Sequence, residues 1–467
     1  MSIRILTKKN VKCKGFQTNR INRNIFTIKE RGKKMAKVAF HTLGCKVNQY
    51  ETEGMMTQFE KLGYDVVGFF EKADIYVINT CTVTNMADKK SRQMLAKAKK
   101  NNPKSLVVAV GCYVQASNKE LLEMIQVDLL IGNTDKGNVV QVIETYLESK
   151  TKPKILDLSQ YKVYDDLWIS MTQDHTRAHI KIQDGCDQFC TYCIIPYARG
   201  RIRSRSVTSI LEECKELAKK GYKEVVLTGI HLASYGIQFD DYKLIDLLED
   251  IQEIEGILRI RLGSLEPTLI TQDFVSRVEK LDKVCPHFHL SMQSGNDVIL
   301  KKMNRKYTTV DYKRAVDRLR EKMPTCAITT DLIVGFPSET EAQFEDTLIF
   351  IKDIGFANMH IFKYSKRNGT PAAKMKEQVN PKERNIRSTR AIEMAENMKE
   401  VFLTGFIDVE MEVLIEEEVI LDHQIYYVGH TTNHIKVYTM STQVLEKNTI
   451  KKIHLKQRFE DGLLGSS

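Results

Sequence analysis

The sequence predicts an α/β protein of three parts: an open parallel sheet, a full or partial parallel barrel, and a small all-β barrel at the C-terminus. In residues 35–145, short apolar runs alternate with helical patterns, which is typical of a parallel sheet with crossover helices. The same alternation continues through residues 172–401 and indicates the strand–helix units of a barrel. Residues 402–467 change to several short strands, which indicates a small barrel.

The pattern places each element within these parts. In the first part we expect strands at residues 38–43, 75–79 and 106–110, and helices at residues 51–62, 87–100 and 118–125. In the second part we expect strands at residues 179–182, 224–227, 259–262, 287–291, 328–334 and 359–364, and a charged helix at 381–401. In the third part we expect strands at residues 409–415, 425–430, 434–438 and 451–455.

Most of the net charge lies in the first segment of the chain. The 467 residues carry a formal charge of +10, and residues 1–34 alone hold eleven Lys and Arg but one acid, Glu30. The rest of the chain is therefore neutral, so net charge by itself does not indicate a nucleic-acid partner. Because a strand pattern begins directly after Met35, we expect this methionine to be the true start. A flexible RNA-binding arm and an organellar transit peptide are the alternatives for residues 1–34.

The composition excludes several classes of protein. Apolar residues make up 42% and charged residues 28%, as in ordinary globular proteins. No apolar run approaches the ~18–20 residues of a membrane-spanning helix, so we expect no membrane partner. With no secretory signal, we expect the cytoplasm, a reducing compartment in which clustered cysteines are more often metal ligands or catalysts than disulfides.

Three of the ten cysteines form a tight cluster. Cys186, Cys190 and Cys193 lie in the run Cys-Asp-Gln-Phe-Cys-Thr-Tyr-Cys, directly after the first strand of the second part. Three thiolates in one loop can hold three corners of an iron–sulfur cube and leave the fourth iron open to another ligand. The alternative is a zinc site whose fourth ligand comes from a distant histidine.

Three further cysteines share a position relative to the first sheet. Cys45, Cys81 and Cys112 each follow the carboxyl end of an expected strand. Because such ends lie along one edge of an open parallel sheet, we expect the three thiols to converge and form a second site with an open position. The alternative is three unrelated small buried residues. We expect Cys13, Cys214, Cys285 and Cys326 to be structural.

These motifs resemble those of the radical S-adenosylmethionine (SAM) methylthiotransferases. The resemblance rests on the cysteine loop and on His-Thr-Leu-Gly-Cys45-Lys-Val-Asn-Gln-Tyr-Glu51, Asn79-Thr-Cys81-Thr-Val-Thr and Val110-Gly-Cys112. It extends from about residue 36 to the end of the chain, where Tyr427-Val-Gly-His-Thr-Thr-Asn433 is similar to the RNA-binding TRAM barrel. The first of these motifs resembles the MtaB branch, which acts on threonylcarbamoyladenosine beside the tRNA anticodon. The branches that act on isopentenyladenosine and on a ribosomal protein are the alternatives, and a zinc-containing RNA-binding protein without catalysis is another.

The resemblance implies cofactors and a division of labour between the two cysteine sets. It implies two [4Fe–4S] clusters and SAM, with Cys186, Cys190 and Cys193 generating a radical from SAM. It also implies that Cys45, Cys81 and Cys112 carry the sulfur for a methylthio group inserted at C2 of adenine. The residues expected to contact SAM lie at strand ends of the barrel or in the cysteine loop: Tyr192, Gly229, His231, Glu266, Gln293, Asp331 and Gly335.

The expected macromolecular partner is tRNA. Four arginines in seven residues, Arg199, Arg201, Arg203 and Arg205, follow the cysteine loop and are suited to bind phosphates or stack on bases. The alternative is that they pair with carboxylates or with SAM inside the protein. In the tail, Lys451 and Lys452 are the expected RNA contacts. We also expect an electron donor of flavodoxin or ferredoxin type, and a monomer.

Overall fold

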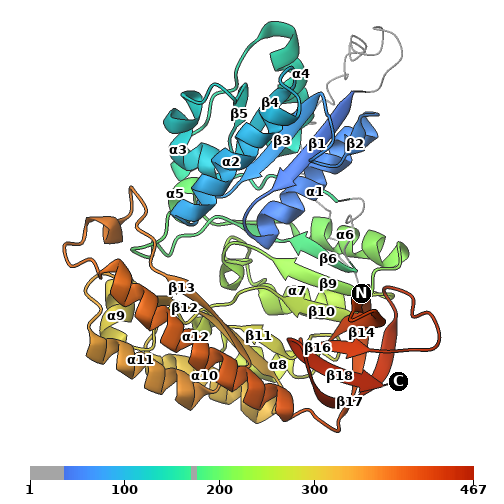
Figure 1. The fold of residues 1–467 in the computed structure, drawn as a ribbon, viewed down its shortest axis with the longest axis vertical. Helices are drawn as coiled ribbons and strands as arrows, with labels where there is room; N and C mark the ends of the chain where they lie inside the picture. Colours follow the sequence, from blue (N-terminus) through green and yellow to red (C-terminus); the bar gives the residue numbers. More distant parts are fainter. Residues whose placement is uncertain (1–35, 170–175, 467) are drawn as a thin grey trace, which may run out of the picture.

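The first part of the chain is a doubly wound parallel sheet (Figure 1). The computed structural model describes residues 36–169 and 176–466, so the expectation for residues 1–34 falls outside the described residues. The sheet has the order β2-β1-β3-β4-β5. Its strands are β1 (Lys37–Thr42), β2 (Asp65–Val67), β3 (Ile75–Thr80), β4 (Leu106–Gly111) and β5 (Leu129–Ile131). Its helices are α1 (Lys46–Lys61), α2 (Asn85–Asn101), α3 (Cys112–Leu122) and α4 (Val139–Ser149).

Alternating side chains of the sheet form two cores. Val38, Val77 and Val108 pack on one face against α1 and α4, while Ala39 and Tyr76 pack on the other against α2 and α3. A strand exposes successive side chains to opposite faces, so helices must cover both faces of such an apolar sheet. The sequence pattern missed the three-residue strands β2 and β5, and it placed α3 six residues too late.

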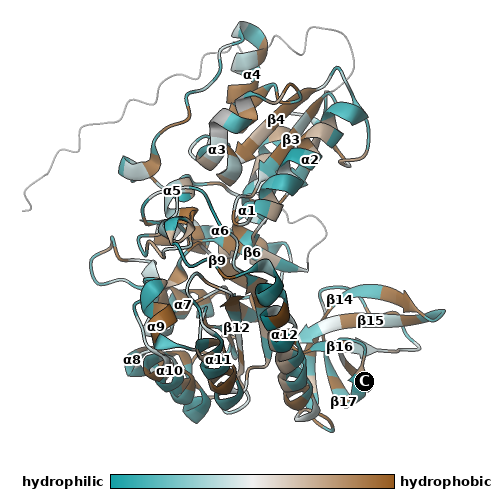
Figure 2. Ribbon diagram, turned by 60° about the vertical axis from the view of Figure 1, so that its left-hand side comes forward, coloured by the Kyte–Doolittle hydropathy of each residue, from teal (hydrophilic) through white to brown (hydrophobic). Residues whose placement is uncertain are grey.

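The second part is a partial parallel barrel, as expected. Its strands pair in the orders β10-β9-β6 and β11-β12-β13, and parallel bridges such as Leu265–Leu290 join the two sets. The strands are β6 (Arg177–Lys181), β9 (Glu224–Thr228), β10 (Arg259–Leu262), β11 (His287–His289), β12 (Ala327–Val334) and β13 (Asn358–Lys363). Outside them lie α6 (Val207–Lys219), α7 (Leu244–Gln252), α8 (Gln272–Val278), α9 (Asp297–Lys302), α10 (Thr309–Lys322), α11 (Glu341–Ile354) and α12 (Pro381–Thr404). Brown, apolar strands such as β12 lie behind teal helix surfaces (Figure 2).

The third part is a small closed barrel with the order β14-β15-β16-β18-β17. Its strands are β14 (Glu410–Leu421), β15 (Gln424–Thr431), β16 (Lys436–Thr439), β17 (Ile450–Phe459) and β18 (Gly462–Ser466). The sequence pattern missed β18, which begins at a glycine and is only five residues long. No helix of the described residues is long and apolar enough to cross a membrane.

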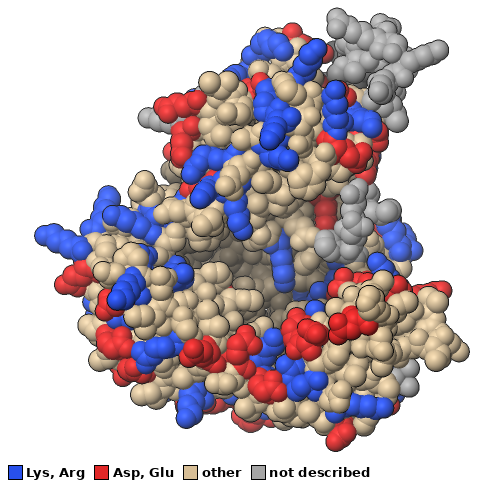
Figure 3. Space-filling model, in the orientation of Figure 1, with Lys and Arg blue, Asp and Glu red and all other residues tan. Residues whose placement is uncertain are grey.

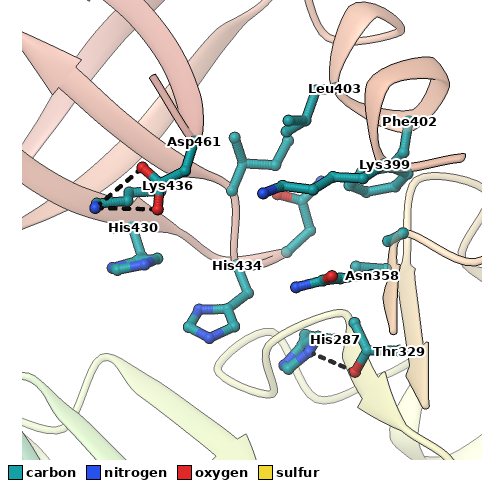
Figure 4. A pocket seen from close by; sticks show the side chains of 14 residues that line it. His287, Thr329, Asn358, Lys399, Phe402, Leu403, His430, His434, Lys436 and Asp461 are labelled. Atoms are coloured by element: carbon teal, nitrogen blue, oxygen red, sulfur yellow. Dashed lines mark hydrogen bonds and ion pairs between the residues drawn. The ribbon is translucent and has the colours of Figure 1, made fainter. Parts of the chain in front are cut away.

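The C-terminal barrel is bound to the partial barrel through arginines. Arg259 donates to the carbonyls of His430 and Glu412 at 3.0 and 2.9 Å, and Arg261 donates to that of Thr432 at 2.9 Å. A cavity of about 170 Å³ lies at this contact. There, the ring of His434 lies 4.7 Å from that of His287 and 4.7 Å from that of His430 (Figure 4).

We predict that acidification weakens this contact. Burial, helped by the charges of Arg261 and Arg177, holds the pKa values of His287 and His434 well below 6.5. His289 and Lys46 add to this effect at His287, and His430 adds to it at His434. The unfolded chain therefore binds more protons below about pH 6.5. Stability is complete above that pH and falls below it, by up to about 1.4 kcal/mol per pH unit for each histidine.

The test is thermal unfolding between about pH 8 and pH 5.5, with iron content checked at each pH. His434→Asn should make the pH dependence shallower, because asparagine tolerates the left-handed backbone at this position, where φ is 67°. His423→Asn is the matched control, because His423 is exposed and also left-handed, with φ of 64°. A slope that is the same in His434→Asn and the unchanged protein would contradict the prediction.

Candidate active site

The first three cysteines converge at one edge of the N-terminal sheet. We call Cys45, Cys81 and Cys112 the N-terminal triad; they follow β1, β3 and β4, which are neighbouring parallel strands. Gly44, with φ of 106°, brings the backbone so close that an added Cβ would lie 2.9 Å from the Cys81 sulfur. Burial raises the pKa of Cys81 to about 12, and the neighbouring Cys112 and Cys45 thiols add to the rise. The three thiols therefore lie within electrostatic range of one another.

The loop triad, Cys186, Cys190 and Cys193, lies beyond the carboxyl end of β6. A short hairpin of β7 (Gln183–Asp184) and β8 (Arg203–Ser204) closes this loop at its base. Gly185 is required there, because an added Cβ would lie 1.8 Å from the carbonyl oxygen of Arg201. Burial raises the pKa of Cys193 to about 12, and the thiols of Cys190 and Cys186 add to the rise.

Both triads fit an iron–sulfur cluster by their donors. Nitrogen donors point at the sulfurs: the Gln188 N–H lies 3.5 Å from Cys186 Sγ, and Arg305 Nη1 lies 3.3 Å from Cys190 Sγ. Among the described residues, no three His, Cys, Asp or Glu side chains lie close enough to share a single metal ion. A four-iron cube spreads its cysteine ligands more widely and binds them as thiolates.

One cavity of about 280 Å³ lies beside the loop triad. Its walls include Val83 and Thr84, which follow Cys81, and Cys193 of the loop triad. Of the residues expected to contact SAM, Tyr192, Gln293 and Asp331 line this cavity. The rest of the lining is mostly apolar: Ile194, Ile195, Ile333, Phe362, Lys363, Tyr364 and Ser365.

Glu266 lies close to His231 and is bound by Arg305, a residue that the sequence analysis missed. Arg305 Nη2 donates to Glu266 Oε1 at 2.6 Å while the same guanidinium contacts Cys190. His231 Nε2 lies 3.7 Å from the same Glu266 oxygen. Burial acts to raise the pKa of Glu266, but the nearby His231 ring and the Arg305 guanidinium outweigh it and hold the pKa below its usual value. The only sequence signal for Arg305 was its place in a basic run.

Gly335 and Gly229, the two glycines expected to contact SAM, have their nearest contacts with other residues of the protein. The N–H of Gly335 donates to Glu339 Oε1 at 3.0 Å, and Arg384 fills the space beside its Cα. The N–H and one face of Gly335 are thus occupied, and the expectation that this residue contacts SAM stays a prediction. At Gly229 an added Cβ would lie 3.0 Å from Gln183, so close packing requires a glycine there whether or not SAM binds.

Three of the four arginines expected to bind RNA are buried. Arg199 and Arg205 are 0% exposed and Arg203 is 5% exposed, so their assignment as RNA contacts is wrong. Arg205 pairs with Glu213 and Asp166, and Arg203 lies 3.6 Å from Asp184. Only Arg201 keeps an exposed guanidinium, with half of its side chain accessible.

Arg199 instead belongs to a buried ionic joint between the first two parts of the chain. The joint consists of Glu51, Lys136, Lys181, Asp184 and Arg199. Arg199 lies 2.8 Å from Glu51 and 3.1 Å from Asp184, and its Nε lies 3.2 Å from Cys112 Sγ. Lys136 and Lys181 approach Glu51 at 2.5 and 2.8 Å. Burial acts to raise the pKa of Glu51, but the three cations overcome it and hold the pKa well below its usual value.

The families that match the chain correspond to these two sites. Residues 37–132 match the family described as "Uncharacterized protein family UPF0004", and residues 180–351 match the "Radical SAM superfamily". A solved radical S-adenosylmethionine methyltransferase, TsrM from Kitasatospora setae, shares the fold, with a TM-score of 0.54 at 15% identity over 73% of this chain and 77% of that one. The fold, the loop triad and the matched family define a radical SAM enzyme.

Relatives with a higher sequence identity indicate which kind of radical SAM enzyme this protein is. A protein of Bacillus subtilis (strain 168) named threonylcarbamoyladenosine tRNA methylthiotransferase MtaB is 40% identical over 91% of this chain and 95% of its own length. Its namesake in Aquifex aeolicus (strain VF5) is 41% identical over 82% and 93%. A tRNA-2-methylthio-N(6)-dimethylallyladenosine synthase of Staphylococcus epidermidis is 38% identical over 79% and 74%. The chain belongs to the MtaB family of radical SAM methylthiotransferases.

Proposed function

We propose that this protein is a tRNA methylthiotransferase that inserts a methylthio group at C2 of N6-threonylcarbamoyladenosine at position 37, next to the anticodon. The observation that carries the proposal is the cavity that Cys193 of the loop triad lines together with Val83 and Thr84, which directly follow Cys81, because radical generation and sulfur insertion must act on one base. Several relatives that match most of the chain carry the name of this activity. The dimethylallyladenosine synthases are also similar, so methylthiolation of that nucleoside is the second candidate.

The proposal assigns a role to each group of residues. Cys186, Cys190 and Cys193 would hold one [4Fe–4S] cluster with SAM on its open iron, and Cys45, Cys81 and Cys112 would hold a second. The bound groups supply the radical chemistry and the sulfur, which no side chain can provide. Tyr192, Gln293 and Asp331 line the space for SAM and the base. The apolar lining excludes water, which protects a reactive intermediate from side reactions.

The remaining partners follow from the same assignment. We assign tRNA contacts to exposed cations: Arg201, Lys451 and Lys452 from the original expectation, and Lys89 and Lys90 at the start of α2. Lys89 and Lys90 follow Val83 and Thr84, which line the cavity, by a few residues in the chain. The C-terminal barrel would act as a TRAM module, although its six Lys and Arg are outnumbered by ten Asp and Glu. We further propose a cytoplasmic monomer that receives electrons from a flavodoxin or ferredoxin.

Nucleoside analysis of tRNA from a deletion strain tests the substrate. We expect methylthio-threonylcarbamoyladenosine to vanish, its precursor without the methylthio group to accumulate, and a plasmid copy to restore the product. Persistence of this nucleoside with loss of methylthio-dimethylallyladenosine would establish the second candidate instead. Anaerobically purified protein should hold about eight iron and eight sulfide per chain. Zinc without sulfide would contradict an enzymatic role.

A further inference from the structure

The inner face of the partial barrel is charged rather than apolar. Alternate residues of the strands, such as Ala178, Ile180 and Ile260, belong to the core beneath the helices, so the residues between them face inward. Most of the inward residues are polar or charged, among them Arg177, Lys181, Glu224, Arg259, Arg261 and His287, with apolar exceptions such as Val226. This wall borders a hollow between the three parts of the molecule (Figure 3). Such a surface is suited to a polar, charged ligand.

Most cations of this wall already have partners. Arg261 lies 2.7 Å from Glu224 and also donates to backbone carbonyls of the C-terminal barrel. Arg177 lies 3.2 Å from Glu416, and Arg259 is bound to carbonyls of the same barrel. These arginines therefore hold the parts of the protein together and are not free to bind a ligand.

Lys46, unlike these arginines, has no ion-pair partner among the described residues. It is exposed, it directly follows Cys45 of the N-terminal triad, and it is the first residue of α1. Its ammonium lies in electrostatic range of Arg177, Arg261 and Glu224, on β6, β10 and β9, and of His287 on β11. Lys46 also lines the same pocket as Cys45 of the N-terminal triad. No carboxylate of a described residue lies within 4.0 Å of the ammonium, so its charge is not neutralised by an ion pair.

We propose that Lys46 binds the carboxylate of the threonylcarbamoyl group and thereby selects this nucleoside. This inference rests on the proposed function. The chemistry fits, because the threonyl moiety is the only anionic part of the modified base. It is attached to N6 of adenine, and the ring carbon that bears N6, C6, is separated from C2 by a single ring nitrogen. A base placed with C2 at the N-terminal triad must therefore carry its N6 substituent beside the same triad, where Lys46 lies.

The test compares two synthetic anticodon stem–loop RNAs that differ in one charge. One carries threonylcarbamoyladenosine and the other its methyl ester, and their dissociation constants are measured by fluorescence anisotropy with the cluster-loaded full chain. The unchanged protein should bind the acid roughly 10- to 100-fold more tightly, the range for a hydrogen bond between charged groups. Lys46→Gln should abolish this preference, and Lys46→Arg should retain most of it.

Lys61→Gln is the matched control, because Lys61 is an exposed lysine at the other end of α1. This variant should keep the preference for the acid, even if both RNAs bind more weakly. Equal binding of acid and ester by the unchanged protein would overturn the proposal, and so would a preference that survives in Lys46→Gln. An equal loss for both RNAs in Lys46→Gln with the preference intact would show a phosphate contact instead. The nucleoside analysis tests the proposed function separately, so the two failures are distinguishable.

Discussion

Replacing Cys190 with alanine should abolish SAM cleavage and methylthio transfer together, whereas Cys81→Ala should abolish only the transfer. Cys190 belongs to the loop triad and receives a hydrogen bond from Arg305, so its loss would remove one of the three ligands of the cluster proposed to bind SAM. Cys81 directly follows β3 of the N-terminal sheet, and it is Val83 and Thr84 after it that line the cavity. Its loss leaves the loop triad and its hydrogen-bond donors intact. The expected loss of product is complete in both variants, and the difference lies in 5′-deoxyadenosine.

The measurement is anaerobic turnover with a chemical reductant, in which 5′-deoxyadenosine and methylthiolated nucleoside are quantified in the same sample. Iron analysis should show about half the metal content in each variant, because each retains one triad. Cys326→Ala is the control, since Cys326 is a buried core cysteine remote from both triads and should retain both products. Product formation by Cys81→Ala at the unchanged rate would remove Cys81 from the site.

The sequence was informative wherever a local pattern decides the structure. The grouping of the six cysteines into two triads could be predicted because strand ends of a parallel sheet must share an edge, and because the C-x3-C-x2-C spacing lies within one loop. The barrel strands were placed to within a few residues, since buried parallel strands are continuous apolar runs or alternate with a charged inner face. Short edge strands such as β2 carry too few residues to show either pattern.

The arginines show where this reasoning fails. Arg199 and Arg205 look like surface cations because arginine is usually exposed, and a sequence reveals a charge but not its partner. The partners are distant: Glu51 is 148 residues from Arg199, on a helix of another part of the chain. A glutamate among the apolar positions of α1, between the buried Tyr50 and Met55, was the available signal. Such a residue is seldom buried unless a cation pairs with it.

Glu51→Gln should weaken the contact between the first two parts of the chain more than any other single isosteric change in the joint. Glu51 is 1% exposed and is paired with Lys136, Lys181 and Arg199. Removing its charge leaves Asp184 to balance these buried cations. Breaking a buried pair in this way costs about 3–5 kcal/mol. We expect a lower unfolding temperature and faster proteolysis in the segment between the first two parts.

The same variant should separate the two activities. The loop triad keeps all its ligands, so SAM cleavage should persist, while methylthio transfer should fall about 100-fold if the triads shift by roughly 1 Å. Glu120→Gln is the matched control, because Glu120 pairs with Arg92 at 2.8 Å but its side chain is 52% exposed. A surface pair of this kind contributes at most about 1 kcal/mol, so both activities should be retained. Parallel loss of SAM cleavage and transfer in Glu51→Gln would show that the joint supports the whole fold rather than the relative position of the two sites.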